Sequence, residues 1–408
     1  MPDTLTTRCS IAGGGPAGMM LGFLLARAGI DVMVLEKYPD FFRDFRGDTI
    51  HPSTMEILEE LGLLDEFLKL PHQEVRQLAG VIGGEEIRIA DFSHLPVKCP
   101  FIDLIPQWDF LNFIAANAKR YSAFHLMMET EATDLVEEKG RVIGIRAKSL
   151  DQALEIRADL VIAADGRHST LRDRSGLQAD SFGAPMDVLW FRLSRRAGDP
   201  GQVFGRVDQG KMMIMLDRGD YWQCGFLIRK GDFENIKQRG VDAFHRDLVT
   251  VAPFLADRTS EIRDWEQVKL LTVAVDRLRQ WYRDGLLCIG DAAHAMSPIG
   301  GVGINLAIQD AVAAANILAP RLQRGRVTIE NLQAVQQRRE PPTRRTQRLQ
   351  ILIQNNLITR ILGHPGRMKL PWILRIARHL PILTRIPARI VGIGFRPEHI
   401  ATGCAAPH

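Results

Sequence analysis

The sequence predicts an α/β protein in which a mainly antiparallel β-sheet is inserted into a domain with a parallel sheet, and a helical region follows. Three observations support this fold class. Short apolar strands at residues 9–12, 159–164 and 286–289 run directly into turns containing glycine or aspartate. Strands between residues 188 and 275 follow one another with few helices between them. The last stretch, after residue 341, mixes basic and apolar residues in a helical pattern.

These patterns divide the 408-residue chain into four segments. Residues 1–180 and 276–340 are expected to form the two parts of one discontinuous domain. Residues 181–275 are expected to form the inserted β-sheet domain, and residues 341–408 a basic C-terminal helical segment. A chain of this length, 46% hydrophobic, can bury a sizeable core.

The first strand leads into a glycine fingerprint. An apolar helix over residues 19–28 follows the fingerprint, and a second strand then ends at Glu36. In this Rossmann-like arrangement Gly13 makes the tight turn, Gly15 lets a pyrophosphate approach the backbone, and Gly18 packs helix on strand. Glu36 is expected to accept hydrogen bonds from ribose hydroxyls. The pattern predicts a dinucleotide site.

A third strand, over residues 286–289, ends in a second ligand-facing turn. Asp291 follows this strand at its carboxyl end, where open α/β sheets bind ligands. Gly301 and Gly303 would let the backbone approach a flat group closely. The helix beginning near Gly303 would direct free N–H groups and a positive dipole at that group, which suits the negative charge of a reduced flavin. An ordinary turn with glycine caps is the alternative interpretation.

Other positions add to this site. The strand over residues 159–164 delivers Asp165 and Gly166 to its carboxyl end, so three strands carry the same kind of turn. Arg46 could reach a pyrophosphate or a flavin, or could be a surface arginine. His51 could act as a base near the site, but a histidine beside a helix is more often structural. The inserted sheet offers apolar candidates for a substrate pocket: Trp190, Phe191, Met212, Met213, Met215, Tyr221 and Trp222.

With all three turns in view, residues 7–340 resemble the class A flavoprotein monooxygenases, the aromatic hydroxylase family typified by p-hydroxybenzoate hydroxylase. The glycine fingerprint with Glu36, the Asp165-Gly166 pair, and the run from Gly290 through Asn305 carry the resemblance. It implies a Rossmann-like FAD-binding domain. The implied FAD-binding residues are Gly13, Gly15, Pro16, Ala17, Gly18, Glu36, Lys37, Arg46, Gln107, Ala132, Asp165, Gly166, Gly290, Asp291, Pro298, Gly301, Val302, Gly303, Ile304 and Asn305.

The resemblance also implies the reaction. NADH or NADPH would reduce FAD, and O2 would then form a C4a-hydroperoxyflavin that hydroxylates a phenol-like or heteroaromatic small molecule. Oxygen would react beside the loop containing Pro298, Gly301 and Gly303. By the same resemblance Asp165 and Gly166 would serve both FAD and the nicotinamide cofactor, which would explain why there is no second glycine fingerprint. No residue can be named as the catalytic base.

Three other functions stay open. A reductase or hydroxylase of isoprenoid or quinone-precursor lipids would share the motifs, and so would a non-catalytic FAD-binding regulator. A flavin-dependent halogenase would share the fold, but its W-x-W-x-I-P signature is absent. The complete loop at residues 298–303 favours an oxygen-reacting enzyme over the regulator.

Charge and cysteine usage limit the partners. Residues 338–408 contain thirteen Lys and Arg against Glu340 and Glu398, so their net charge is +11; because the whole chain carries +4, the rest carries −7. We expect these helices to pack over the flavin domain with their arginines in solvent, although a basic amphipathic helix could lie on an anionic membrane. Five scattered cysteines predict no metal site. Without a signal peptide pattern we expect a cytoplasmic protein. Nucleic-acid binding has no support from the predicted fold, so we do not expect it. A homodimer stays open.

Overall fold

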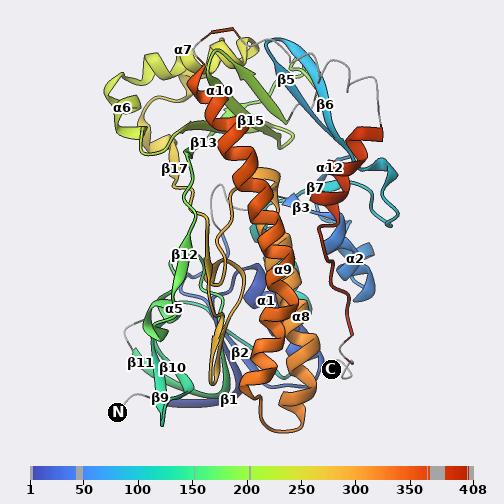
Figure 1. The fold of residues 1–408 in the computed structure, drawn as a ribbon, viewed down its shortest axis with the longest axis vertical. Helices are drawn as coiled ribbons and strands as arrows, with labels where there is room; N and C mark the ends of the chain where they lie inside the picture. Colours follow the sequence, from blue (N-terminus) through green and yellow to red (C-terminus); the bar gives the residue numbers. More distant parts are fainter. Residues whose placement is uncertain are drawn as a thin grey trace.

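The computed structural model describes residues 3–42, 49–150, 152–201, 204–364, 366–367, 382–401 and 403. Two large β-sheets lie at opposite ends of an elongated molecule, and a long helix runs along one side between them (Figure 1). This is the predicted fold class, a Rossmann-like domain joined to a mainly antiparallel sheet.

The first sheet is mainly parallel, with the order β19-β20-β11-β1-β2-β8, and β10 and β9 extend it from β11 in antiparallel fashion. The parallel pairs β1–β2, β1–β11 and β11–β20 place the three strands predicted from the sequence side by side. The strands are β1 (Asp3–Ala12), β2 (Val32–Leu35), β8 (Phe124–Met127), β9 (Thr130–Glu138), β10 (Arg141–Ser149), β11 (Gln152–Ala163), β19 (Tyr282–Arg283) and β20 (Leu286–Cys288).

Helices cover this sheet, and α1 contacts both α4 and α8. A Cβ at Gly22 would lie 2.7 Å from the side chain of Val34, so α1 packs close to β2. The helices are α1 (Pro16–Arg27), α2 (Pro52–Glu60), α3 (Leu64–Phe67), α4 (Gln107–Ala118), α5 (Thr170–Ser175) and α8 (Gly303–Gln323). Ile299–Gln323 is long and apolar enough to cross a bilayer, but 72% of its most apolar window is buried, as in a core helix.

The second sheet has the order β17-β13-β16-β15-β14-β5-β6, and α6 (Phe233–Gln238) and α7 (Val241–Val251) pack on its outer face. The hairpin β5–β6 comes from the segment predicted to belong to the first domain, so the range 181–275 omits part of this sheet. The strands are β5 (Gln77–Ile82), β6 (Glu85–Asp91), β13 (Met186–Ser194), β14 (Gly205–Asp208), β15 (Lys211–Asp217), β16 (Tyr221–Arg229) and β17 (Lys269–Leu271).

Small sheets join the two parts. β12 (Ala179–Ser181) pairs with β18 (Asp276–Leu278) where the chain enters and leaves the second sheet. A three-stranded sheet with the order β3-β7-β4 consists of β3 (Thr49–Ile50), β7 (Ile102–Leu104) and β4 (Gln73–Val75).

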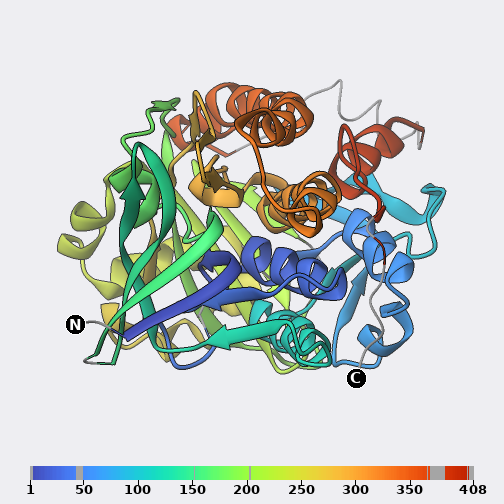
Figure 2. The same ribbon diagram turned by 90° about the horizontal axis from the view of Figure 1, so that it is seen from below.

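The long helix α9 (Ile329–Ile353) runs through the predicted boundary at residues 340–341 and contains Pro341 and Pro342. It continues through a π-helical turn into α10 (Thr359–Gly363). Pro387 lies inside α12 (Ile382–Gly392). There it removes the helical partner of the Leu383 carbonyl, and this loss is tolerable because Leu383 is exposed to water. Figures 1 and 2 both show α9 and α12 on the same side of the molecule.

Candidate functional site

Four strand ends form one row at the carboxyl edge of the first sheet. The pairing register sets Leu35, Ala12, Ala163 and Cys288 side by side on β2, β1, β11 and β20. The backbone N–H of Gly13, directly after β1, donates to the Leu35 carbonyl at 2.8 Å. The turns predicted near residues 13, 165 and 291 therefore meet at one edge, which is where open α/β sheets bind ligands.

The glycine fingerprint contains two kinds of glycine. A Cβ at Gly13, whose φ is +105°, would lie 2.3 Å from a backbone oxygen, and a Cβ at Gly18 would lie 2.0 Å from the Gly13 carbonyl oxygen. These two are required by packing inside the protein. At Gly15, by contrast, a Cβ would have no neighbour within 4 Å in the described part of the chain. The N-terminus of α1, beginning at Pro16, has no side-chain cap. Its free N–H groups therefore face open space, as anion binding requires.

Glu36 lies beside this fingerprint, as predicted. It is buried, and its carboxylate accepts a hydrogen bond from the Gly14 N–H at 3.0 Å. The Thr130 N–H donates to the Glu36 carbonyl at 2.8 Å, which brings the first residues of β9, including Ala132, to the end of β2. Lys37 is exposed. The residues predicted to surround the adenosine thus gather at one corner of the site.

Asp165 makes contacts inside its own turn. Its carboxylate accepts hydrogen bonds from the Ser169 hydroxyl and, at 3.2 Å, from the Leu171 N–H, so it caps α5. Burial raises the pKa of this carboxyl above its ordinary value. Gly166 has a φ of +88° and open space beside it. The contact of this pair with a cofactor stays a prediction.

Asp291 follows Gly290 at the end of β20. Its carboxylate is about one-third exposed and lies 3.7 Å from the guanidinium of Arg167. Arg167 directly follows Gly166 but was not among the predicted site residues. A Cβ at Gly290 would lie 3.1 Å from the Ala17 side chain, so this turn fits closely between α1 and α8. The ion pair thus joins the second and third turns.

The glycine loop is tied to the segment before α2. Asn305 is buried, and its side-chain oxygen accepts hydrogen bonds from the His51 N–H at 2.9 Å and the Thr54 hydroxyl at 2.7 Å. The Thr49 hydroxyl donates to the Gly301 carbonyl at 3.0 Å. Asn305, which we predicted to bind FAD, therefore holds the loop in place through protein contacts.

The first turn of α8 is open. Gly303 is its first residue. Among the residues that the structure describes, a Cβ there would have no neighbour within 4 Å and no side chain caps the helix. Val302 and Ile304 flank this opening and are partly exposed, as is Pro298 at the start of the loop. Free N–H groups at this helix end suit a ligand that carries negative charge.

The inner face of the second sheet forms an apolar wall beside this loop. Ile299 belongs to the same hydrophobic cluster as Trp190, Met212 and Ile214. The other predicted pocket residues do not lie on this wall, because alternate residues of a strand face opposite sides of the sheet. Those that pack on the outer face with α7 are Phe191, Met213, Met215 and Trp222. Tyr221 stacks beneath the guanidinium of Arg192.

A buried charge cluster lies beneath the turn at Gly290. Asp310 accepts a hydrogen bond from the Gly290 N–H at 3.1 Å and lies 2.6 Å from His294 Nε2. Arg339 from α9 pairs with Asp310 and with Glu398, each at 3.0 Å. Burial alone would raise the pKa of Asp310, but His294 and Arg339 lower it below its ordinary value. The one signal of this cluster in the sequence is a carboxylate within the apolar helix α8.

Helix α9 also holds the chain that leads into the glycine loop. The Gln347 amide donates to the carbonyl of Ala295 at 3.0 Å, and the Gln350 amide donates to the carbonyls of Ser297 and Ile299 at 2.9 and 2.8 Å. Both glutamines are buried. The helix predicted to begin a separate C-terminal segment is thus part of the support of the site.

For two predicted residues the role in FAD binding stays a prediction. Arg46 lies outside the described residues, and Gln107 begins α4 with a partly exposed side chain.

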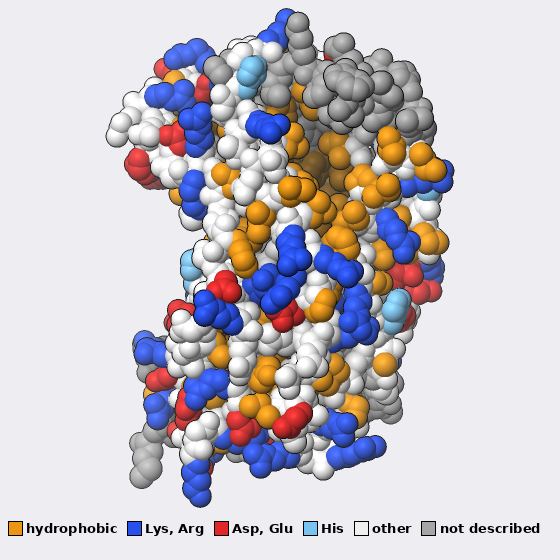
Figure 3. Space-filling model, in the orientation of Figure 1, with side chains coloured by type: hydrophobic (Ala, Val, Ile, Leu, Met, Phe, Trp, Pro, Cys, Tyr) orange, Lys and Arg blue, Asp and Glu red, His pale blue; other side chains and the backbone are white. Residues whose placement is uncertain are grey.

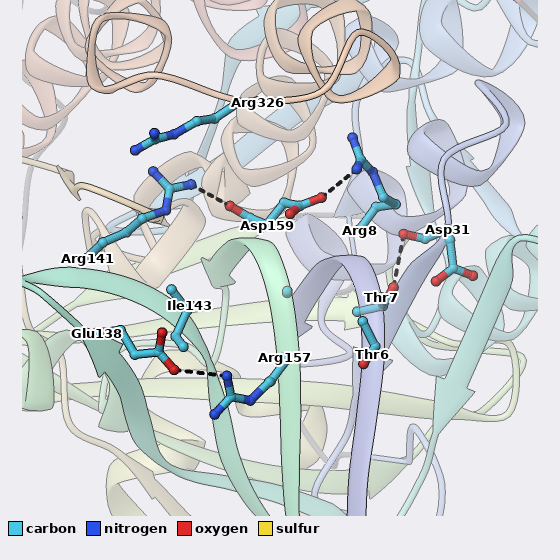
Figure 4. Close-up of a pocket in the computed structure, with 11 residues that line it drawn as sticks. Thr6, Thr7, Arg8, Asp31, Glu138, Arg141, Ile143, Arg157, Asp159 and Arg326 are labelled. Carbon is cyan, nitrogen blue, oxygen red and sulfur yellow. Dashed lines mark hydrogen bonds and ion pairs between the residues drawn. The ribbon is translucent and has the colours of Figure 1, made fainter.

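A polar depression at the opposite ends of the strands, shown in Figure 4, includes Arg8, Arg141 and Asp159. Arg8 pairs with Asp159 at 2.7 Å, and Arg141 donates to the Asp159 carbonyl at 2.8 Å. These arginines already have partners, so we assign no ligand to the depression.

Comparison with known proteins agrees with this geometry. The FAD binding domain family matches residues 6–349. The 6-methylpretetramide 4-monooxygenase of Streptomyces rimosus is 32% identical over 352 residues, 86% of this chain and 84% of that protein. The chain belongs to the FAD-binding family of flavoprotein monooxygenases.

Solved structures show the same fold. A probable FAD-dependent monooxygenase from Pseudomonas aeruginosa, pqsL, superposes with a TM-score of 0.74 at 22% identity, covering 88% of this chain and 97% of that one. The OxyS anhydrotetracycline hydroxylase from Streptomyces rimosus superposes with a TM-score of 0.73 at 21% identity, covering 95% and 76%.

FAD fits the residues present. The uncapped ends of α1 and α8 and the open positions at Gly15, Gly166 and Gly303 leave space that a Cβ would enter. Gly15 and α1 would hold the pyrophosphate, and Glu36 the adenosine ribose. The first turn of α8 would stabilise negative charge on the ring system. When bound, FAD supplies the redox chemistry and the activation of O2, and the protein supplies position and exclusion of water.

Proposed function

We propose that this protein is an NADH- or NADPH-dependent hydroxylase that uses O2 to hydroxylate a phenol-like or heteroaromatic small molecule. The observation that carries the proposal is the junction at the glycine loop. Ile299 reaches the apolar wall of Trp190, Met212 and Ile214, and the open turn of α8 begins at Gly303, four residues later. An apolar ring would therefore bind directly beside the helix end that accommodates the flavin.

The apolar wall and the N-terminus of α8 have separate tasks. The wall excludes water and orients an aromatic ring through its apolar surface. The N-terminus of α8 stabilises negative charge on the opposite side. The 32% identical relative is named 6-methylpretetramide 4-monooxygenase, and another relative is named 2,4-dichlorophenol 6-monooxygenase. The second name supports a phenol-like substrate class.

Three measurements on the purified protein test the proposal. FAD is quantified after denaturation, NADH and NADPH oxidation is followed with and without a panel of phenols and N-heteroaromatic compounds, and products are identified by mass spectrometry. We expect non-covalent FAD near one per chain. We also expect oxidation that an aromatic compound stimulates, and a product that gains one oxygen atom from labelled O2.

The Met212→Lys variant tests the apolar wall. Met213→Leu, on the opposite face of β15, is its control. Lysine at position 212 should abolish stimulation by the aromatic compound and leave the flavin content unchanged, whereas Met213→Leu should retain stimulation. FAD that binds but never accepts electrons from NADH or NADPH would favour a non-catalytic regulator. Stimulation only by isoprenoid or quinone-precursor lipids would favour the lipid-modifying alternative.

A further inference from the structure

Helix α12 carries its large aliphatic side chains on the outside. A surface helix of a soluble protein normally turns such residues toward the core. In α12 the buried positions hold small residues spaced four apart, namely Thr384, Ala388 and Gly392. The exposed positions hold large ones, with exposed fractions of 65% for Ile382, 44% for Leu383 and 61% for Ile386.

Close packing explains the small inner residues. A Cβ at Gly392 would lie 2.9 Å from the Leu95 side chain and 3.3 Å from that of Phe92. The Val391 carbonyl is anchored to His51 at 2.7 Å. The orientation of α12 is therefore determined by its contacts, and its outer aliphatic face is left without a protein partner among the described residues.

The same side of the molecule presents further apolar surface. Leu352 near the end of α9 is 60% exposed, and Leu357 in the following π-helical turn is 53% exposed. Figure 3 shows hydrophobic side chains gathered on this side around a hollow between the end of α9 and α12. Contiguous apolar surface of this kind marks an interaction site.

Cations accompany the aliphatic residues. Arg385 and Arg389 on α12 are exposed and have no acidic partner among the described residues. Arg345, Arg348 and Arg360 are exposed on α9 and α10. The segment 338–408 carries a net charge of +11, against −7 for the rest of the chain.

We infer that the face formed by α12 and the end of α9 docks on an anionic lipid bilayer. A bilayer surface offers acyl chains for Ile382, Leu383 and Ile386, and anionic headgroups for the arginines around them. A second copy of the chain fits less well, because a two-fold contact through α12 would bring Arg385 and Arg389 against their own equivalents.

Co-sedimentation of the FAD-loaded full chain with vesicles tests the inference. We expect binding to vesicles of phosphatidylcholine mixed with phosphatidylglycerol, weaker binding to phosphatidylcholine alone, and release by salt. The double variant Ile382→Ser/Ile386→Ser should bind less. The double variant Arg385→Gln/Arg389→Gln should lower the partition coefficient about fivefold for each arginine.

Matched controls lie at the other end of the molecule. Leu150→Ser, at a side chain 69% exposed, and Lys139→Gln in the turn after β9 should bind like the unmodified protein. The inference is overturned if anionic vesicles leave the protein in the supernatant, or if the controls weaken binding as much as the α12 variants. Sedimentation velocity that shows a dimer dissolved by Ile382→Ser/Ile386→Ser would overturn it in favour of a second copy. The readout does not depend on hydroxylation, so it can fail separately from the proposed function.

Discussion

His51 and Val391 are joined across 340 residues of sequence by one contact, in which Nδ1 of the imidazole lies 2.7 Å from the carbonyl oxygen. A carbonyl only accepts, so Nδ1 carries the proton and Nε2 of the neutral ring does not. Nε2 is buried and has no hydrogen-bond partner among the described residues. A segment near the C-terminus therefore determines the tautomer of a histidine beside the glycine loop.

The pH dependence of stability should report this histidine. Burial lowers the pKa of His51 to about 4, although the bond to Val391 partly opposes this effect. Between pH about 6.5 and 4 the unfolded chain binds a proton that the folded chain does not. The contribution of His51 to the free energy of unfolding therefore falls as the pH falls, by up to about 1.4 kcal/mol per pH unit. Urea unfolding across this range should show a flatter curve for His51→Asn, which keeps an N–H for Val391 and lacks Nε2. Parallel curves would contradict the assignment.

The contribution of Asp103 to the free energy of unfolding should change with pH in the direction opposite to that of His51. It is fully buried on β7, and neither carboxylate oxygen has a hydrogen-bond partner among the described residues. Burial, with a smaller contribution from Glu74, raises the pKa of Asp103 to about 7. The folded chain retains a proton that the unfolded chain loses above pH about 4. Its contribution to stability is therefore present at low pH and is lost as the pH rises through about 7.

The Asp103→Asn variant removes this titration. We expect it to be more stable than the unmodified protein above pH about 7 and to show little difference below pH about 4. Equal stability at all pH values would mean that the carboxyl is solvated.

Two glycines of the loop should respond differently to substitution. A Cβ at Gly301 would lie 2.6 Å from the Thr49 hydroxyl, and its φ is +63°, so Gly301→Val should destabilise the protein itself. Gly303 has open space and a helical backbone, so Gly303→Ala should fold normally. Its methyl group would occupy the space that the flavin needs. We expect reduced FAD affinity and more hydrogen peroxide per NAD(P)H consumed.

Gly198→Ala is the control for this pair, because its Cβ also enters open space but in a loop of the second sheet. FAD affinity and peroxide yield measured for all three variants decide the matter. Unchanged values in Gly303→Ala would show that the first turn of α8 does not contact the flavin.

Glu398 should contribute strongly to stability. It is 4% exposed and shares Arg339, which is 1% exposed, with Asp310. Glu398→Gln leaves the guanidinium with one buried carboxylate in place of two, and the cost should be on the order of 3 kcal/mol in urea unfolding. Glu137→Gln, in the more exposed pair with Arg283, should cost less than about 1 kcal/mol. Similar values for the two variants would contradict a buried charge cluster.

Asp291 should contribute to FAD binding. Its carboxylate is partly exposed at the edge of the site, so the loss of one hydrogen bond accepted from a ribityl hydroxyl in Asp291→Ala should weaken binding about tenfold. Fluorescence titration of the apoprotein with FAD measures the change. Asp65→Ala, at a side chain 88% exposed, is the control. Identical affinities for the two variants would show that Asp291 is misassigned.

The sequence by itself determined the carboxyl edge of the first sheet. Each of the turns after β1, β11 and β20 is recognisable from its own residues, and parallel strands must bring such turns to one edge. It also indicated strands in this region, but not which of their alternate residues face the flavin domain. Only the packing of α7 on one side and of Ile299 on the other placed Met213 in the core and Met212 at the site.

Tertiary structure alone decided the long-range connections. The hairpin β5–β6 joins the second sheet through the parallel pairing of β5 with β14. The two strands lie more than a hundred residues apart in the sequence, so no local pattern could indicate this pairing. Helix α9 continues through Pro341 and Pro342, because contacts with the first domain on both sides of the prolines, through Arg339 and Gln347, hold it there. The partner of a buried charge is determined by what the folded chain brings beside it. Asp310 could therefore be recognised as unusual from its apolar helix, but Arg339 and Glu398 could not be assigned to it from sequence spacing.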